Sequence, residues 1–210
     1  MAEMISPTVP PGGPIVEWGW AGRALDGPSG DLHVVVPFDG GTLVALLDGL
    51  GHGDAAAAAS QAAVPVLEAH ASEPVARLVQ RCHEALRGTR GAVMTLASFD
   101  ARDGSMTWTG VGNVDGILRR VRDGQQRRDE AIATRGGVVG YRLPPLKADR
   151  LPLSRGDTLV MATDGIRSNF SAGVTMEYSP QEIAESILVR YGKDSDDAHV
   201  VVARYLGAGS

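Results

Sequence analysis

The sequence predicts an α+β fold in which antiparallel β-sheets carry helices on their outer faces. Short apolar segments outnumber helical ones, and most are separated by turns that contain Gly or Asp-Gly rather than by helices. A parallel sheet would instead need a helix after almost every strand. Hairpins between antiparallel strands therefore explain the pattern best.

Eight segments have the length and apolar pattern of strands, and they fall into three groups along the chain. Three come first, with Asp26-Gly27 and Asp39-Gly40 as turns between them. Three more follow the first helical region, and two strongly apolar segments stand near the end. The expected strands are residues 15–20, 31–38, 42–47, 92–99, 106–111, 117–121, 158–163 and 200–206.

Two long segments between the strand groups have helical character. Residues 54–70 are rich in alanine, and Pro65 predicts a kink or a break inside them because proline removes a backbone donor. Residues 73–86 place apolar side chains on one face, and Gly88 follows as a stop signal. Cys82 lies on that apolar face, so core packing is its expected role.

A third helix and a long irregular segment complete the pattern. Ser179, Pro180 and Glu182 match a capping box with proline at the first helical position, and Gly192 marks the expected end of that helix. Residues 122–155 are polar and rich in Gly and Pro, which predicts loops with at most one short strand.

Length and composition restrict the class of protein. The 210 residues suit one domain, expected over residues 15–210 after a flexible, proline-rich tail at residues 1–14. The chain has 20 basic and 25 acidic residues and a net charge of −5, which argues against nucleic acid or an anionic membrane as the main partner. A single cysteine, no signal-peptide pattern and no apolar run of membrane-spanning length lead us to expect a cytoplasmic protein.

Two Asp-Gly pairs stand in a context unlike a turn. Asp48-Gly49 and Asp164-Gly165 each follow a strongly apolar strand and precede another apolar residue. A carboxylate at the end of a buried strand is unfavourable unless it is paired or bound to a cation. Two such carboxylates on similar strands suggest a shared cation site, and ordinary strand-end aspartates remain the alternative.

More acidic residues fit the same hypothesis. Asp31 starts a strand, and Asp194, Asp196 and Asp197 directly precede the last one. Carboxylate and carbonyl oxygens suit hard divalent ions such as Mg²⁺ or Mn²⁺. The sequence has no cluster of cysteines or closely spaced histidines, so a zinc site is disfavoured.

The glycines around residue 50 allow a second interpretation. A strand, a turn containing Gly49, Gly51 and Gly53, and a helix also begin dinucleotide-binding folds. The third glycine of that motif is missing, however, and Asp54 in its place would repel a pyrophosphate. No Gly-x-Ser-x-Gly elbow and no phosphate-binding Gly-Lys-Ser/Thr motif occurs elsewhere.

Five short motifs occur in an order that is specific as a set. Together they resemble the metal-dependent protein phosphatases of the 2C type (PPM), in the bacterial SpoIIE branch, and most resemble a small stand-alone member over residues 15–206. The motifs are Ser29-Gly30-Asp31, Asp48-Gly49-Leu50-Gly51-His52-Gly53, Gly110-Val111-Gly112-Asn113, Ala162-Thr163-Asp164-Gly165 and Asp196-Asp197-Ala198-His199-Val200.

The resemblance implies an αββα sandwich, two packed antiparallel sheets flanked by helices, with metal ions at one edge. It implies that Asp48 bridges two Mn²⁺ or Mg²⁺ ions and that the Gly49 carbonyl completes one of them. Asp164 and Asp196 would hold the first metal, and Asp31 would serve the second metal or its water. Asp196 matches the family ligand because Asp or Asn follows it in the family, as Asp197 does here. A bridging water would attack the phosphorus of phosphoserine or phosphothreonine.

The chain departs from the family pattern at two points. Many eukaryotic relatives have a histidine, proposed as general acid, where this chain has Leu50. His52 lies two residues further on and is either the proton donor or an ordinary loop residue. Arg23 is a candidate for the phosphate-contacting arginine, with a solvated surface arginine as the alternative.

The resemblance also implies a partner class. The substrates would be phosphorylated STAS-domain proteins of a stress-signalling complex, and we expect the enzyme to act as a monomer. A phosphatase-like module that binds such proteins without turnover is the alternative. The segment 122–155 is a candidate docking element or a solvated loop. Its arginines are Arg122, Arg127, Arg128, Arg135 and Arg142.

Overall fold

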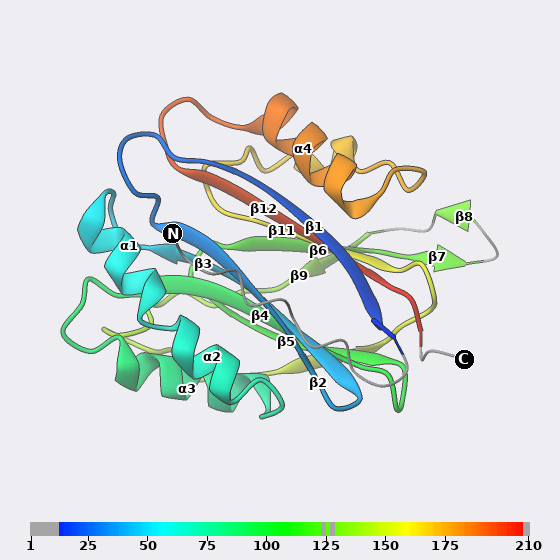
Figure 1. Ribbon diagram of the computed structural model, residues 1–210, viewed down its shortest axis with the longest axis horizontal. Helices are drawn as coiled ribbons and strands as arrows, with labels where there is room; N and C mark the ends of the chain where they lie inside the picture. Colours follow the sequence, from blue (N-terminus) through cyan, green and yellow to red (C-terminus); the bar gives the residue numbers. More distant parts are fainter. Residues whose placement is uncertain (1–12, 123–124, 127–128, 208–210) are drawn as a thin grey trace.

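The protein is a sandwich of two five-stranded antiparallel sheets (Figure 1). The computed structural model describes residues 13–122, 125–126 and 129–207. In spatial order, the first sheet contains β1 (Val16–Arg23), β12 (Ala198–Tyr205), β11 (Thr158–Ala162), β6 (Asp115–Arg119) and β9 (Glu130–Ile132). The second contains β10 (Asp149–Pro152), β5 (Ser105–Val111), β4 (Ala92–Asp100), β3 (Gly41–Gly49) and β2 (Asp31–Phe38).

Helices cover the outer faces of both sheets (Figure 1). Helices α1 (Asp54–Gln61), α2 (Val64–Ala69) and α3 (Val75–Ala85) pack on the second sheet, and α4 (Pro180–Tyr191) packs on β1 and β12 of the first. The predicted αββα arrangement is confirmed. A short 3₁₀ turn, η1 (Phe170–Gly173), lies against α4. Within the described ranges, no helix has the length and hydropathy needed to cross a membrane.

The two strands that run into the Asp-Gly pairs are buried on both faces. In β3, Leu43 and Leu47 point to the core beneath α2 and α3, whereas Val44 and Leu46 point to the core between the sheets. In β11, alternate residues likewise face the core between the sheets and the core beneath α4. This double burial explains why both strands read as continuous apolar runs instead of alternating ones.

The predicted helices form with the expected boundaries. The break near Pro65 is confirmed, because α1 ends at Gln61 and Pro65 lies in the first turn of α2, where no backbone donor is needed. Cys82 is fully buried on α3, and this burial raises the pKa of its thiol to about 12. The capping box of α4 is present, with Ser179 and Glu182 bonded to each other's backbone N–H groups.

Two expectations about connections were wrong. Segment 122–155 contributes three short strands, β8 (Gln125–Gln126), β9 and β10, where at most one was expected. They are two to four residues long, too short to show a period of two, and Pro152 ends β10 at a sheet edge, where proline is tolerated. The turn at Asp26-Gly27 does not join a hairpin, because β1 and β2 lie in different sheets.

The dinucleotide-binding alternative is excluded by the topology. The strand that precedes Gly51 and Gly53 pairs antiparallel with both of its neighbours, β2 and β4. A doubly wound parallel sheet, which creates the dinucleotide crevice, is therefore not formed around β3.

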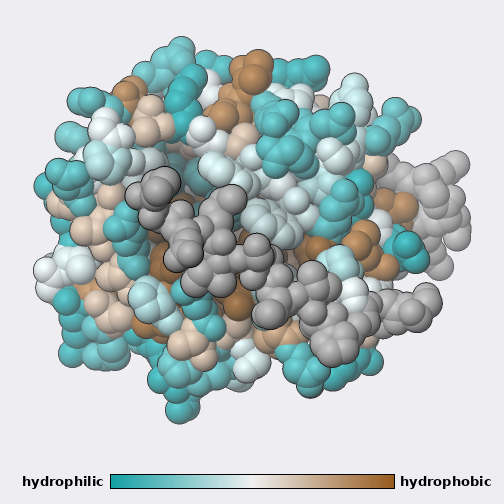
Figure 2. Space-filling model, in the orientation of Figure 1, coloured by the Kyte–Doolittle hydropathy of each residue, from teal (hydrophilic) through white to brown (hydrophobic). Residues whose placement is uncertain are grey.

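The outer edge of β1 is closed by a side chain from α4. The Trp20 N–H donates to Gln181 Oε1 over 3.1 Å, and Gln181 Nε2 donates to the Trp20 carbonyl over 2.9 Å. The helix comes this close because residue 19 is glycine: a Cβ there would lie 2.4 Å from the Cα of Gln181. On the face shown in Figure 2, visible hydrophobic residues form small groups among hydrophilic ones.

Candidate active site

Four segments that carry the predicted site residues meet at one end of the sandwich. Asp48 ends β3 and Asp31 begins β2, and these two residues are direct partners in the antiparallel register. Asp164 follows β11 and Asp196 precedes β12, which are also paired antiparallel. The end of one strand therefore adjoins the start of its neighbour in both sheets. Helix α1 begins at this end, on the left of Figure 1.

An open cavity of about 440 Å³ lies at this end. Three of its lining side chains are the carboxylates of Asp48, Asp164 and Asp196, and Asn113 and His52 add further polar groups. Asp31 is 7 % exposed and lies against the cluster without lining this cavity. The structure thus brings together the aspartates that the sequence singled out, with one of them buried.

The carboxylates of Asp48 and Asp31 hold their protons unusually strongly. Burial, together with the charges of neighbouring aspartates such as Asp31 and Asp164, raises the pKa of Asp48 to about 8. For Asp31, burial and the charges of nearby aspartates outweigh the effect of a 2.7 Å hydrogen bond from the Thr163 hydroxyl, which favours ionisation, and the pKa is raised to about 7. A nearby positive charge would therefore favour ionisation of both groups at neutral pH.

The donor set fits hard divalent cations that keep part of their water. It consists of carboxylate oxygens, and the Asn113 amide donates to Asp164 Oδ2 over 2.8 Å. In the part of the chain that the structure describes, no group of three or more Asp, Glu, His or Cys side chains is arranged so that it could hold a metal ion, so a cation here would be bound by fewer carboxylates together with water. Mg²⁺ in particular is usually held by one or two carboxylates and several waters, so an open arrangement suits it.

The two Asp-Gly pairs need glycine because a side chain at either position would overlap a neighbouring segment. A Cβ on Gly49 would lie 2.1 Å from the carbonyl oxygen of Ala56 in α1, and a Cβ on Gly165 would lie 1.8 Å from the carbonyl oxygen of Asp197. Neither glycine has a positive φ, so close backbone approach explains both. Each aspartate is thereby followed directly by a point at which another segment packs against the chain.

The neighbouring acidic residues have different environments. Asp197 is 5 % exposed, and its two oxygens accept hydrogen bonds from the backbone N–H groups of Leu25 (2.8 Å) and Gly30 (2.9 Å). Asp194 is almost fully exposed and pairs with Arg23 over 3.1 Å. Of the three carboxylates before β12, only Asp196 lines the cavity.

Of the two basic residues predicted to act in catalysis, His52 lines the cavity and Arg23 does not. His52 is exposed and lines the cavity, as Leu50 does. Arg23 does not line it: its guanidinium donates to the Lys193 carbonyl and faces a neighbouring cavity beside Trp20. Asp31 lines that neighbouring cavity as well, and the role of Arg23 as the phosphate contact stays a prediction.

Sequence reasoning missed an arginine at the cavity rim. Arg90 is exposed, and its Nη1 would lie 2.6 Å from a Cβ on Gly51, a lining residue of the cavity. The Leu50 N–H donates to the Gly91 carbonyl over 3.0 Å, which fixes the two segments side by side. Arg90 stands in a turn before β4, and no spacing pattern in the sequence links it to Gly51.

Segment 122–155 is divided between the two ends of the molecule. Val138 lines the cavity, and Arg135 exchanges backbone hydrogen bonds with Gly110 and Gly112 close to Asn113. The ribbon formed by β7 (Val121–Arg122) and β8 projects at the opposite end from α1 (Figure 1). Arg127 and Arg128 lie outside the described residues.

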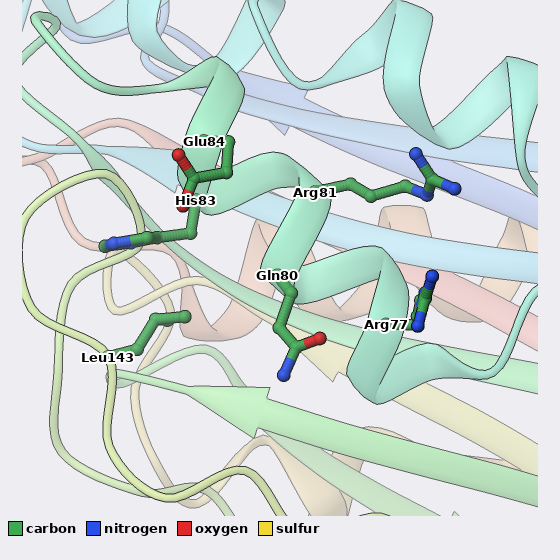
Figure 3. Close-up of a pocket in the computed structure, with 6 residues that line it drawn as sticks. All are labelled: Arg77, Gln80, Arg81, His83, Glu84 and Leu143. Carbon is green, nitrogen blue, oxygen red and sulfur yellow. The ribbon is translucent and has the colours of Figure 1, made fainter.

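A further cavity of about 440 Å³ lies on the outer side of α3 (Figure 3). Gln80, His83 and Leu143 line one side of it, whereas Arg77 and Arg81 point away from them. Arg81 forms a two-point hydrogen bond with Glu73, and the His83 ring accepts the Gly140 N–H. It contains no cluster of carboxylates, so it is not the candidate catalytic cavity.

Comparison with known proteins assigns the family. Residues 39–206 match the family model for stage II sporulation protein E (SpoIIE), so the chain belongs to the SpoIIE family, and its fold matches that of PP2C phosphatase domains. It is similar to the phosphoserine phosphatase RsbX of Bacillus subtilis, with 27% identity over 180 residues that cover 83% of this chain and 86% of RsbX.

Two solved structures are particularly similar to this one. The first, from a study of the bacterial stressosome as a modular system adapted to control secondary messenger signalling, has a TM-score of 0.81 and 30% identity, and covers 90% of this chain and 99% of that one. The second is RsbX in complex with magnesium, with a TM-score of 0.79, 23% identity, and coverage of 90% and 95%.

Proposed function

We propose that the protein is a Mn²⁺- or Mg²⁺-dependent phosphatase that hydrolyses phosphoserine or phosphothreonine in a protein substrate. The observation that most supports this function is the convergence of four acidic segments on one open cavity. Burial and the charges of neighbouring aspartates raise the pKa values of Asp48 and Asp31, so the site favours binding of positive charge.

Each carboxylate has a proposed role. Asp48 lies at the centre and would contact two ions, with the Gly49 carbonyl beside it. Asp164 and Asp196 would hold one ion, and Asp31 would hold the second or a water on it. Ions bound there supply the positive charge that acidifies water and stabilises the phosphoryl group during attack.

Other side chains hold these groups in place. The Thr163 hydroxyl donates to one oxygen of Asp31, and the Asn113 amide donates to Asp164, so each keeps further lone pairs for a cation. His52 is the cavity's one candidate, among the described lining residues, for donating a proton to the serine leaving group.

The substrates we propose are phosphorylated STAS-domain proteins of a stress-signalling complex. The similarity to RsbX and to a structure from stressosome work supports this assignment. Arg135 and the loop around Val138 lie beside the cavity and are the candidate docking part of segment 122–155. We expect the protein to act as a monomer in the cytoplasm.

The alternative is a module that binds such proteins without turnover. Retention of Asp31, Asp48, Asp164 and Asp196 around the cavity favours the enzyme. The test measures phosphate release from a phosphorylated STAS protein and from p-nitrophenyl phosphate, each with Mn²⁺, with Mg²⁺ and with EDTA. Turnover that requires the metal supports the proposal; tight binding of the phosphoprotein without release of phosphate would support the binding module.

A further inference from the structure

Both oxygens of the buried Asp197 carboxylate accept hydrogen bonds from the backbone of one loop. Its Oδ1 accepts the Leu25 N–H over 2.8 Å and its Oδ2 accepts the Gly30 N–H over 2.9 Å, across more than 160 residues of sequence. Both donors lie in the loop that joins β1 of the first sheet to β2 of the second. Charge-assisted hydrogen bonds to backbone N–H groups are among the stronger polar contacts in proteins.

Gly30 also connects the loop held by Asp197 to the second sheet. Its carbonyl accepts the Gly49 N–H over 3.0 Å and the hydroxyl of Ser60 in α1 over 2.5 Å. Gly30 directly precedes Asp31, and Gly49 directly follows Asp48. Gly30, through its N–H and its carbonyl, thus links Asp197 to the strands that carry Asp31 and Asp48.

The backbone of Asp197 meets the fourth segment. Gly165 packs against the Asp197 carbonyl so closely that a Cβ would lie 1.8 Å from it. Asp197 also follows Asp196 in the chain, and its N–H donates to Asp196 Oδ1 over 2.9 Å. All four segments that carry the cavity carboxylates therefore converge on Asp197 and Gly30.

We propose that Asp197 is a positioning residue, which fixes the separation of Asp31, Asp48, Asp164 and Asp196 without binding a cation itself. This inference rests on the proposed function of the same site. A carboxylate is required because two N–H donors must be accepted, whereas an asparagine has one acceptor oxygen and its amide would oppose the second N–H. A buried carboxylate beside other carboxylates is tolerated because these two donors compensate its charge.

The two hydrogen bonds from the Leu25 and Gly30 N–H groups to Asp197, here called the clamp, also hold a residue of the cavity rim. Leu25, whose N–H it holds, is half-exposed and lines the cavity. Release of that N–H would free both the rim of the cavity and the start of β2. The expected defect is therefore weaker metal binding together with local opening of the loop, rather than loss of the fold.

The test compares Asp197→Asn with Asp194→Asn, which changes an exposed carboxylate of the same loop. The first measurement is amide hydrogen exchange at Leu25 and Gly30 in the full chain with EDTA. The second is the Mn²⁺ dissociation constant by calorimetry. In Asp197→Asn, we expect exchange at one or both amides to accelerate at least about tenfold. We also expect Mn²⁺ affinity to fall by roughly 10- to 100-fold. Asp194→Asn should change neither.

Wild-type exchange and Mn²⁺ affinity in Asp197→Asn, or equal losses in both variants, would overturn the inference. These readouts do not depend on turnover. If the wild-type protein binds Mn²⁺ but hydrolyses no phosphoester, the proposed function fails while the clamp is still supported by its own result. If Asp197→Asn does not fold, exchange in the wild-type protein decides: protected Leu25 and Gly30 amides support the clamp, and exchange as fast as that of Gly27 contradicts it.

Discussion

Asp31 lies directly opposite Asp48 across the β2–β3 pair, so two carboxylates face each other at the open end of the hairpin, away from its turn. Like charges at such opposed positions destabilise a sheet. Burial raises the pKa values of both groups, and for Asp48 the charge of Asp31 raises the pKa as well. The pair therefore favours either protonation or a bound cation, and four predictions follow from the site around it.

Replacing either strand-end aspartate should abolish hydrolysis and spare the fold. We expect Asp48→Asn and Asp164→Asn each to remove nearly all phosphate release, because each removes a proposed cation ligand. In EDTA, the midpoint of thermal unfolding of Asp48→Asn should equal or exceed that of the wild type, since the substitution relieves repulsion. Full activity of Asp48→Asn with Mn²⁺ would contradict the two-metal site.

The metal-free protein should lose stability as pH rises. Asp31 and Asp48 titrate near 7 and 8 in the folded protein, against 3.8 ordinarily, so between these values the folded state binds protons that the unfolded chain has released. Burial lowers the pKa values of His33 and His199 from 6.5 to about 4 and about 3, so these two groups contribute the opposite slope below about pH 6.5. The free energy of unfolding should therefore decrease from about pH 6.5 to about pH 8, as Asp31 and Asp48 lose their protons, and level off above it. Mn²⁺ competes with these protons, so its stabilising effect should grow over the same range.

Thermal unfolding measured from pH 6.5 to pH 9, above the range in which His33 and His199 contribute, with EDTA and with Mn²⁺, checks this prediction. The Asp48→Asn variant is the control, and its pH dependence in EDTA should be shallower. A wild-type stability that rises toward pH 8 in EDTA would show that these carboxyls are already ionised in the folded protein.

The role of His52 can be measured by its removal. If the cations provide most of the catalysis, His52→Ala should reduce kcat by less than about tenfold, whereas loss of a general acid typically costs ~100- to 10,000-fold. The pH profile of kcat separates the two cases. A loss in the larger range with an altered basic or acidic limb would assign the proton transfer to His52.

Arg90 should contribute to binding of the phosphoprotein. Its guanidinium lies on Gly51 at the rim, and among the described residues no carboxylate pairs with it within 4 Å. We expect Arg90→Ala to raise KM for a phosphoserine protein about tenfold or more, with a smaller effect on p-nitrophenyl phosphate, because charge-assisted contacts contribute roughly 1.5–3 kcal/mol.

Arg87→Ala is the matched control, since Arg87 is an exposed arginine three residues earlier that pairs with Glu84 over 3.4 Å. It should leave both substrates unaffected. Equal kinetics of the Arg90→Ala and Arg87→Ala proteins would exclude Arg90 from substrate recognition.

The features that the sequence predicted are those with strong local signals. Strands β3 and β11 are continuous apolar runs because both faces are buried. Each leads into an Asp-Gly pair whose aspartate lines the cavity. The capping box at Ser179 and the break at Pro65 are equally local, since both depend on backbone donors within one turn. The expected meeting of Asp31 with Asp48 follows from antiparallel pairing alone.

What the sequence could not predict depends on distant contacts. The family resemblance favoured Asp196 as the metal ligand, but nothing in the sequence indicated that Asp197 accepts the backbone N–H groups of Leu25 and Gly30, because that contact depends on the loop from β1 to β2. Strand β9 has one buried residue, Ile132, which leaves no periodic pattern to detect. The approach of Arg90 to Gly51 arises from packing of a turn against a loop, which no local rule encodes.

The amide of Gln181 accepts from and donates to the same residue of β1, Trp20, and so reproduces the pair of hydrogen bonds that another strand would make. At that position the main chain offers an incoming strand neither a donor nor an acceptor. Helix α4 therefore covers one face of the sheet and also blocks the hydrogen-bonding edge of β1 at Trp20. Self-association through the Trp20 edge would first have to displace this side chain, which protects the protein from strand-to-strand aggregation while its aromatic rings remain half-exposed.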